Sequence, residues 1–277
     1  RSSDLPGAAK GELLHLLAAR GGKIDARAKS RELAELIGAS KLGGSRTSAV
    51  AVSQEDGLLC ERFAVEGATG AMIPCVVLRK PGREPRRITL VADRKGKANA
   101  IKRDEVKALL GRGVAVCLAD LRSSGENAWM IEGLVDDHDS LRASLWLGRT
   151  MVGEWAEDLS AVRSILASDH PSAAVDLLAF DESALAALAA AAIGVKFDRV
   201  TAVSLLHSYV GDGVKPVQGM SILVPGILKW GDVSLLAALA KCPVVVSSAV
   251  RSSGARLTAA DLAAWRRETA ALKRRLE

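Results

Sequence analysis

Aromatic side chains are scarce in this sequence, because Phe, Trp and Tyr together make up only 3% of its 277 residues. Sites that stack single-stranded nucleic acid or sugar rings depend on such side chains, so both kinds of site are disfavoured. Hydrophobic residues still make up 49% of the chain and charged residues 25%, which is typical of a packed globular protein. Its core must therefore be filled mainly by Ala, Leu and Val.

Cysteine is also rare, and no C-x-x-C pair occurs, which argues against a zinc or thioredoxin-type site. All the cysteines sit in apolar runs, where buried free thiols are expected: Cys60, Cys75, Cys117 and Cys242. A Cys60–Cys75 bridge stays open if the flanking strands pair. The acidic run 136–139 cannot easily converge on one ion, since its residues are adjacent in sequence. We expect no metal and no cofactor.

Long hydrophobic runs are absent as well. The most apolar stretch, Ala184–Ile193, has about half of the roughly 20 residues that a membrane-spanning helix requires. Neither a signal peptide nor a membrane span is predicted, and the compartment is unknown. The net charge of +6 is spread along the chain, so no specific nucleic-acid site is expected. No glycine-rich phosphate motif follows a predicted strand.

The chain is predicted to have two parts, a helical extension with a linker at residues 1–45 and a main domain at residues 46–277. Within the first part, Glu12–Ala19 and Arg31–Ile37 show the apolar spacing of helices, and glycine pairs punctuate them. The small and polar stretch Ala39–Ser48 predicts the linker.

In the main domain, apolar strands alternate with helical patterns. A hairpin is predicted first, from Leu58–Glu66 and Met72–Lys80, with its turn at Gly67–Gly70. The later strands are predicted at Arg87–Ala92, Val114–Asp120, Ala174–Phe180, Val200–Leu206 and Pro243–Ser248. The helices are predicted at Asp104–Leu110, Leu141–Ala167, Ser183–Ile193, Val233–Ala240 and Ala259–Leu276. This order indicates an α/β fold with a mostly parallel, doubly wound sheet and an antiparallel hairpin at its edge.

Ligands of doubly wound sheets bind at the carboxyl ends of the strands. Four strand-end loops are therefore candidates: Ala92–Ala100, Leu121–Asn127, Phe180–Ser183 and His207–Gly213. The third is a strand that runs directly into a helix, which is the layout of a nucleophile elbow. Asp181 occupies the tip, because the residues two positions away, Ala179 and Ser183, are both small. Alternatively, Asp181 caps the helix through its carboxylate.

Three stretches resemble the α/β-hydrolase superfamily, and most of all its acetyl xylan esterase and dienelactone-hydrolase-like branches. Val116–Glu126 resembles the strand and "D-x-R-G-x-G" loop of those esterases, with Asp120 and Arg122 at the first and third motif positions. Leu147–Leu159 resembles the helix that follows, and Pro225–Val246 resembles the segment that leads into the penultimate core strand. The resemblance spans roughly residues 58–265 and implies an oxyanion hole. Its donors would be backbone N–H groups of Glu182 and of the loop at Ala92 and Asp93.

The chain departs from this family at each catalytic position. The resemblance implies a serine between glycines at the elbow, but the elbow reads Ala-Phe-Asp-Glu-Ser. It implies an acid after the strand Pro243–Ser248, but Ala249–Gly254 carries no carboxylate. It implies a histidine after a further strand, but that strand is not predicted and the last histidine is His207. The Ser–acid–His triad is therefore not completed.

His207 ends a strand expected to lie beside the elbow strand. An Asp181 nucleophile activated by His207 is therefore one hypothesis. We expect instead that His207 bonds within its own loop, near Tyr209 or Asp212, and that no triad exists. For Asp120 we expect a structural role, in which it accepts backbone N–H groups of the loop Arg122–Glu126.

Three functions stay open at this point. The first is a carboxylic-ester hydrolase with an altered site and weak or no activity. The second is a non-catalytic hydrolase-fold module for ligand binding or assembly, and the third is a hydrolase with an Asp nucleophile. A small molecule or ester, a protein partner and a second copy of the chain are all open as partners.

Overall fold

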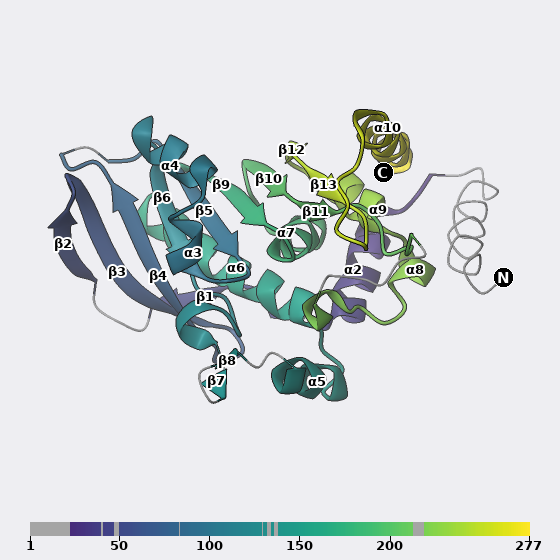
Figure 1. Cartoon of the computed structure of the whole chain (residues 1–277), viewed down its shortest axis with the longest axis horizontal. Helices are drawn as coiled ribbons and strands as arrows, with labels where there is room; N and C mark the ends of the chain where they lie inside the picture. Colours follow the sequence, from purple (N-terminus) through teal and green to yellow (C-terminus); the bar gives the residue numbers. More distant parts are fainter. Residues whose placement is uncertain are drawn as a thin grey trace.

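The computed structural model describes residues 23–39, 41–46, 50–82, 84–128, 130–131, 134–135, 138–212 and 219–277 (Figure 1). The helix predicted at Glu12–Ala19 lies outside these residues. The first described helix, α2 (Ala26–Ile37), begins after Asp25, whose carboxylate accepts a hydrogen bond from the N–H of Ala28, and it ends at Gly38. The prediction of a helix over Arg31–Ile37 is therefore confirmed.

One central sheet organises the molecule. Its strand order is β1-β3-β4-β6-β5-β9-β10-β12, and β2 also pairs with β3. The bounds are β1 (Gly44–Arg46), β2 (Ala51–Glu55), β3 (Leu58–Gly67), β4 (Met72–Arg79), β5 (Arg87–Asp93), β6 (Ala115–Ala119), β9 (Ala174–Phe180), β10 (Arg199–Val203) and β12 (Val244–Val246). The neighbouring strands β6, β5, β9, β10 and β12 run parallel to one another. The strands β1 to β4 pair antiparallel, and β4 also pairs antiparallel with β6. The prediction of a mostly parallel sheet with an antiparallel hairpin edge is confirmed.

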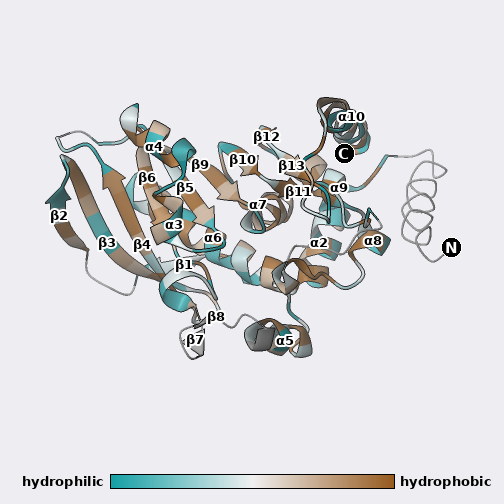
Figure 2. Ribbon diagram, viewed as in Figure 1, coloured by the Kyte–Doolittle hydropathy of each residue, from teal (hydrophilic) through white to brown (hydrophobic). Residues whose placement is uncertain are grey.

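Helices cover both faces of this sheet. Besides α2, the longer helices of the described residues are α4 (Asp104–Gly111), α5 (His138–Trp146), α6 (Met151–Asp169), α7 (Ser183–Ala192), α9 (Val233–Leu239) and α10 (Ala259–Arg275). The short elements are α3 (Lys97–Ala100), β7 (Met130–Ile131), β8 (Leu134–Val135), β11 (Leu205–Leu206), α8 (Ile227–Trp230), β13 (Ala249–Val250) and the 3-10 helices η1 (Gly125–Asn127) and η2 (Met220–Ile222). Figure 2 shows the middle strands and α7 as predominantly hydrophobic.

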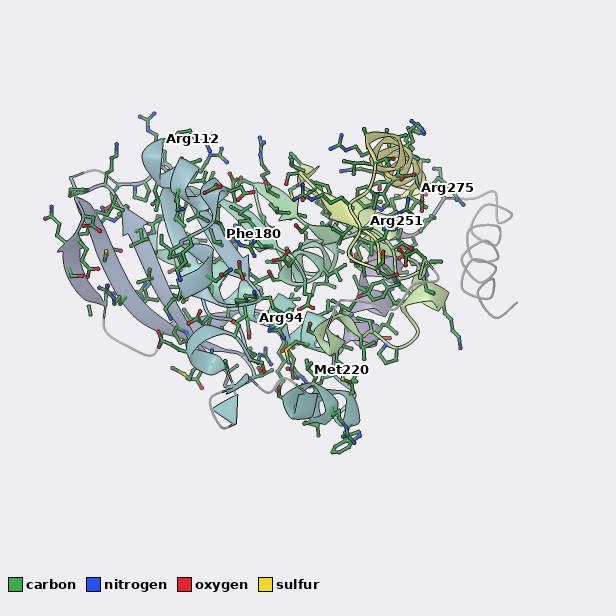
Figure 3. The ribbon with its side chains drawn as sticks, viewed as in Figure 1. Arg94, Arg112, Phe180, Met220, Arg251 and Arg275 are labelled. Carbon is green, nitrogen blue, oxygen red and sulfur yellow. The ribbon has the colours of Figure 1, made fainter. Side chains whose placement is uncertain are left out.

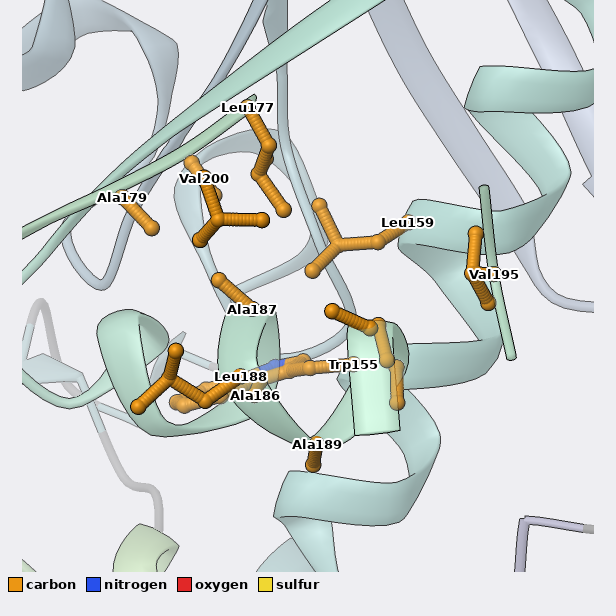
Figure 4. Packing of buried hydrophobic residues seen from close by; sticks show 14 of the residues in the cluster. Trp155, Leu159, Leu177, Ala179, Ala186, Ala187, Leu188, Ala189, Val195 and Val200 are labelled. Carbon is orange, nitrogen blue, oxygen red and sulfur yellow. The ribbon is translucent and has the colours of Figure 1, made fainter. Parts of the chain in front are cut away.

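The core has two apolar layers, one on each face of the sheet. In β9, Leu177 and Ala179 face the layer made with α6 and α7, whereas Leu178 and Phe180 face the layer that includes Val106 of α4. This alternation follows from the period of two in a strand. Every residue of α7 is buried, and Figure 4 shows its alanines packed against β9, β10 and α6. Small side chains let α7 approach the sheet closely, so this core needs few aromatic residues.

Three predicted segments differ from the structure. The helical region predicted over Leu141–Ala167 is two helices, α5 and α6, separated by a turn in which Gly148 has a φ of 70°. The strand predicted over Val200–Leu206 breaks at Ser204, which has a φ of 55°. The linker predicted over Ala39–Ser48 contains β1, which pairs with β3. The expected division after residue 45 thus falls inside β1, and the two-part organisation stays a prediction.

All the cysteines are free and buried, so the Cys60–Cys75 bridge is not formed. Strands β3 and β4 do pair, but the residue opposite Cys75 is Phe63, three positions away from Cys60. Burial raises the pKa of the Cys75 thiol, and a hydrogen bond with Cys117 raises it further. Burial also raises the pKa of Cys60 and of Cys242.

We expect these thiols to resist modification in the folded protein, because the thiolate is the reactive form and burial disfavours it. A chromogenic disulfide reagent should titrate about four thiols in denaturant, the number in the sequence, and almost none under native conditions. A thiol that reacts in the native protein as fast as free cysteine would contradict the burial described here.

Within the described residues, no single helix has the length and apolar character needed to cross a membrane. The bent pair Met220–Trp230 and Val233–Leu239 reaches that length and composition only when both parts are taken together.

Candidate functional site

A cavity of about 940 Å³ opens at the carboxyl ends of the parallel strands. Three of the four strand-end loops singled out in the sequence supply lining residues, namely Arg94 and Lys95 after β5, Ser123–Gly125 after β6, and Asp181 and Glu182 after β9. In the fourth loop, none of the described residues 207–212 lines the cavity. Figure 3 shows Arg94 near the middle of the molecule, between Phe180 and Met220. The cavity therefore lies where doubly wound sheets usually bind ligands.

Backbone strain is concentrated around this cavity. Three of its lining residues, Ser123, Asp181 and Ser204, have φ angles of 56°, 54° and 55°. They lie beyond the carboxyl ends of β6, β9 and β10. Left-handed backbone is uncommon for residues other than glycine and persists only where the surrounding structure enforces it. Among the described residues, the other such residue is Asp56, in the turn between β2 and β3.

Asp181 occupies the tip of the turn between β9 and α7. Its N–H donates to the carbonyl oxygen of Val203, and its own carbonyl oxygen accepts from the N–H of Ala184. Its carboxylate pairs with Arg103, with 2.6 Å between Oδ2 and Nη2. The N-cap residue of α7 is Glu182, and no side chain among the described residues caps the helix by a hydrogen bond. The helix-capping alternative for Asp181 therefore has no supporting hydrogen bond among the described residues.

Arg103 links the elbow to the loop after β5. Its Nε donates to Oδ2 of the buried Asp93 over 2.8 Å, and its guanidinium lies 4.6 Å from the ring centre of Phe180. Asp93 also accepts from the N–H of Lys95 and from the amide of Asn99. The Asp181 carboxylate is thus held by a cation that is itself fixed on two other sides.

The two segments expected to supply an oxyanion hole differ in their access to the cavity. Ala92 and Asp93 are the last residues of β5 and pair with β9, and the following residues, Arg94 and Lys95, line the cavity instead. The carbonyl oxygen of Ala92 accepts from the hydroxyl of the fully buried Ser183. The oxyanion role of Glu182, Ala92 and Asp93 stays a prediction.

The side chain of Glu182 ties three segments together. Its carboxylate accepts from the N–H of Gly219 over 2.7 Å and from the hydroxyl of Ser221 over 2.8 Å. It also pairs with Arg94, whose Nε lies 2.5 Å away. Gly219 and Ile222 both line the cavity. The residue after the elbow tip therefore fixes one wall of the cavity through its side chain.

His207 contacts a neighbouring strand. Its Nδ1 lies 3.0 Å from the carbonyl oxygen of Val250 in β13, and its own carbonyl oxygen accepts from the indole N–H of Trp265. The hydroxyl of Tyr209 donates to Ile222, while Asp212 accepts from Ser252 and Ser253. His207 is thus tied to a neighbouring strand, and its expected bond within its own loop stays a prediction.

The segment that leads to His207 contributes other residues to the cavity. Ser204 and Leu206 line the cavity, whereas Leu205 and His207 do not. No hydrogen bond among the described residues joins His207 to Asp181, and none of the described lining residues is a histidine. The structure therefore does not bring these two sequence candidates together.

Asp120 organises the loop after β6. It is buried, and its carboxylate accepts from the N–H of Glu126 over 2.9 Å and from the N–H of Lys97 over 2.6 Å. The ammonium group of Lys97 binds the same carboxylate. Gly125, with a φ of 52°, lies so close that a Cβ there would be 2.1 Å from Asp120 Oδ1. Asp120 thus joins two of the loops that line the cavity.

Arg122 anchors the same loop on α6. Its N–H and Nε donate to the carboxylate of Asp158 over 2.9 and 2.8 Å, and its Nη2 donates to Glu157 over 3.1 Å. Its carbonyl oxygen accepts from the indole of Trp155. Burial raises the pKa of Asp158, and the charge and hydrogen bonds of Arg122 oppose that rise. Arg149 also pairs with Glu157, so the cluster holds two arginines.

Several residues that shape the site carried no signal in the sequence. Arg103 lies 78 positions from Asp181, and nothing in its local pattern indicates that pair. Arg94 lies in the candidate loop Ala92–Ala100, but nothing in the sequence indicates its pair with Glu182. Ser204 was placed inside a strand. Within the described residues, no group of three or more His, Cys, Asp or Glu side chains could hold a metal ion.

The strand order and the elbow between β9 and α7 define an α/β-hydrolase fold, and the resemblance in the sequence is confirmed at this level. A similar structure is that of a proposed acetyl xylan esterase from Bacteroides fragilis NCTC 9343, with a TM-score of 0.70, 13% identity, and coverage of 91% of this chain and 73% of that chain. Acetyl xylan esterase 1 from Thermoanaerobacterium sp. JW/SL YS485 gives a TM-score of 0.51 and 14% identity, over 81% of this chain and 78% of that chain.

The acetyl xylan esterase from Paenibacillus sp. R4 gives a TM-score of 0.50 and 13% identity, over 91% of this chain and 84% of that chain. No family model and no curated protein matches the sequence. At these identities the likeness shows the fold, so the chemistry has to be argued from the side chains of the site.

Proposed function

We propose that this protein binds a small ligand in the cavity beside the elbow and hydrolyses carboxylic esters weakly or not at all. The observation that carries the proposal is the ion pair of Asp181 with Arg103 at the position where the fold places its nucleophile. A serine nucleophile needs a neighbouring base to take its proton, and this position holds a carboxylate paired with a guanidinium.

The expected loss of activity is large. A complete nucleophile–base–acid set contributes on the order of 10⁶-fold to turnover. The described lining residues include no histidine that could act as a base towards an ester in the cavity. Arg103 also stabilises the charge of Asp181 directly, which lowers the reactivity of that carboxylate towards a carbonyl carbon.

Ligand binding is supported by the shape and the lining of the cavity. Its volume of about 940 Å³ lies within the range of about 300–1,000 Å³ usual for small-molecule sites. Apolar side chains and hydroxyl groups share the lining, as Leu185 and Ile222 lie with Ser123 and Ser204. The strained backbone at the rim supports a functional role for the same place.

The hydrolase with an Asp nucleophile is a second candidate, favoured by one observation. Asp181 has the left-handed backbone that an elbow requires at its tip, and its side chain is 44% exposed at the cavity. The pair with Arg103 argues against it. The two candidates differ in whether any activity depends on Asp181.

We expect the purified protein to release nitrophenol from p-nitrophenyl acetate, and acetate from acetylated xylo-oligosaccharides, no faster than buffer does. Asp181→Ala should leave these rates unchanged, and so should Arg112→Ala, a matched change at an exposed position far from the cavity. Turnover that disappears in Asp181→Ala but not in Arg112→Ala would establish the Asp nucleophile. Turnover that survives Asp181→Ala would reject both the proposed inactivity and that nucleophile.

A further inference from the structure

We infer that the ligand of the cavity is an organic anion with an apolar body. This inference rests on the proposed function and adds the chemical class of the ligand. It is carried by the charges of the lining side chains, which do not cancel.

Both acidic side chains in the lining already have an arginine partner. Asp181 pairs with Arg103, and Glu182 pairs with Arg94 while accepting two further hydrogen bonds. An incoming cation would therefore have to displace a fixed arginine to reach either carboxylate.

Three basic side chains line the cavity beside these two acids, because Lys95 and Arg256 add to Arg94. Lys95 and Arg256 both line the cavity, and neither forms an ion pair with any described residue. They come from separate segments, the loop after β5 and the stretch between β13 and α10. Both residues are also exposed to solvent, so their charges face a ligand that enters the cavity and favour one of negative charge.

The remainder of the lining suits an apolar body. Leu185, Leu206, Ile222 and Val250 all contribute to it. A neutral ligand would fill this region but leave both cations with water alone. A ligand with a negative group would gain charge-assisted hydrogen bonds, which are roughly twice as strong as neutral ones. The cavity should therefore discriminate by charge between ligands of the same shape.

A pair of fluorescent probes tests this directly. Anilinonaphthalene sulfonate and its uncharged parent phenylnaphthylamine share an aromatic body and differ by one sulfonate. We expect the sulfonate to bind at least about tenfold more tightly, since one charged hydrogen bond corresponds to about that factor. The double variant Lys95→Gln with Arg256→Gln should lose this preference while its affinity for phenylnaphthylamine changes less than about twofold.

Two controls make the result specific. Lys102→Gln with Arg112→Gln removes the same charge from exposed positions that do not line the cavity, and should leave both affinities within about twofold. Ile222→Trp fills the cavity and should abolish binding of both probes. Circular dichroism and thermal melting check that each variant is folded.

The outcomes separate the two proposals. Equal affinity for both probes, unaffected in Lys95→Gln with Arg256→Gln but lost in Ile222→Trp, overturns the anion preference and leaves the ligand-binding function standing. Sulfonate binding that survives Ile222→Trp places its site elsewhere and overturns the inference. Failure of both probes to bind rejects the inference together with the proposed function.

Discussion

Replacement of Arg122 by methionine is expected to lower the free energy of unfolding by about 3–5 kcal/mol, the usual cost of removing one partner from a buried ion pair. Asp158 is completely buried and Glu157 nearly so, with side-chain exposures of 0% and 2%. Without the guanidinium, Asp158 would keep only the backbone N–H of residue 122 as a partner. Urea denaturation followed by circular dichroism measures the change.

The loss should depend on pH in a defined direction. Burial already raises the pKa of Asp158, and removal of Arg122 takes away an interaction that lowers it. A carboxyl group whose pKa is raised on folding favours the folded state below its unfolded pKa, and this contribution is lost as the pH rises through the folded pKa. Arg122→Met should therefore lower the free energy of unfolding more at about pH 8 than at about pH 5.

Arg112→Met provides the control for Arg122→Met. This arginine is exposed at the end of α4, so its replacement should change stability by no more than about 0.5 kcal/mol. If both variants unfold at the same urea concentration, the cluster around Arg122 does not stabilise the fold.

Gly153→Ala should destabilise the protein by about 3 kcal/mol or more, at the upper end of the cost of overpacking. Gly153 lies in α6 where this helix meets the end of α2, and a Cβ there would be 2.1 Å from the carbonyl oxygen of Ile37. That oxygen belongs to the backbone and also accepts from Thr150, which caps α6. Neither helix can therefore move aside without weakening the hydrogen bonds from Thr150 to Ile37. Thermal melting measures the loss.

Gly111→Ala is the matched change in another helix. Gly111 ends α4, and a Cβ there meets no atom within 4 Å. Alanine should therefore stabilise the protein by about 0.4–1 kcal/mol, because it reduces the conformational entropy of the unfolded chain. A similar melting shift in both variants would refute the close approach of α6 to α2.

Much of the fold could be predicted because its central strands are continuous apolar runs. β9 was predicted at its observed bounds, and α7 within one residue, since the chain passes there from a hydrophobic run to a helical pattern. β1 and β2 were missed because Gly44–Arg46 and Ala51–Glu55 are polar and mostly exposed. Their pairing with β3 depends on tertiary contacts, which local pattern does not contain.

The candidate site could be predicted only in part. Asp181 was located at the elbow because small residues flank it, and this depends on neighbours in sequence. Its ion pair with Arg103 joins distant segments and leaves no local pattern. The bond of His207 to Val250 could not be predicted, because the break at Ser204 and the pairing of β11 with β13 give its ring a partner on another strand.

The left-handed residues around the cavity imply a trade-off between stability and function. Each such residue costs on the order of 1–3 kcal/mol, against a net stability of about 5–15 kcal/mol for a typical domain. Glycine at Ser123, Asp181 or Ser204 would relieve that cost, because it adopts this backbone freely. A sequence shaped for stability alone would carry glycine there. The side chains at these three positions therefore indicate that the chemistry they supply at the rim of the cavity matters more than the stability that glycine would add.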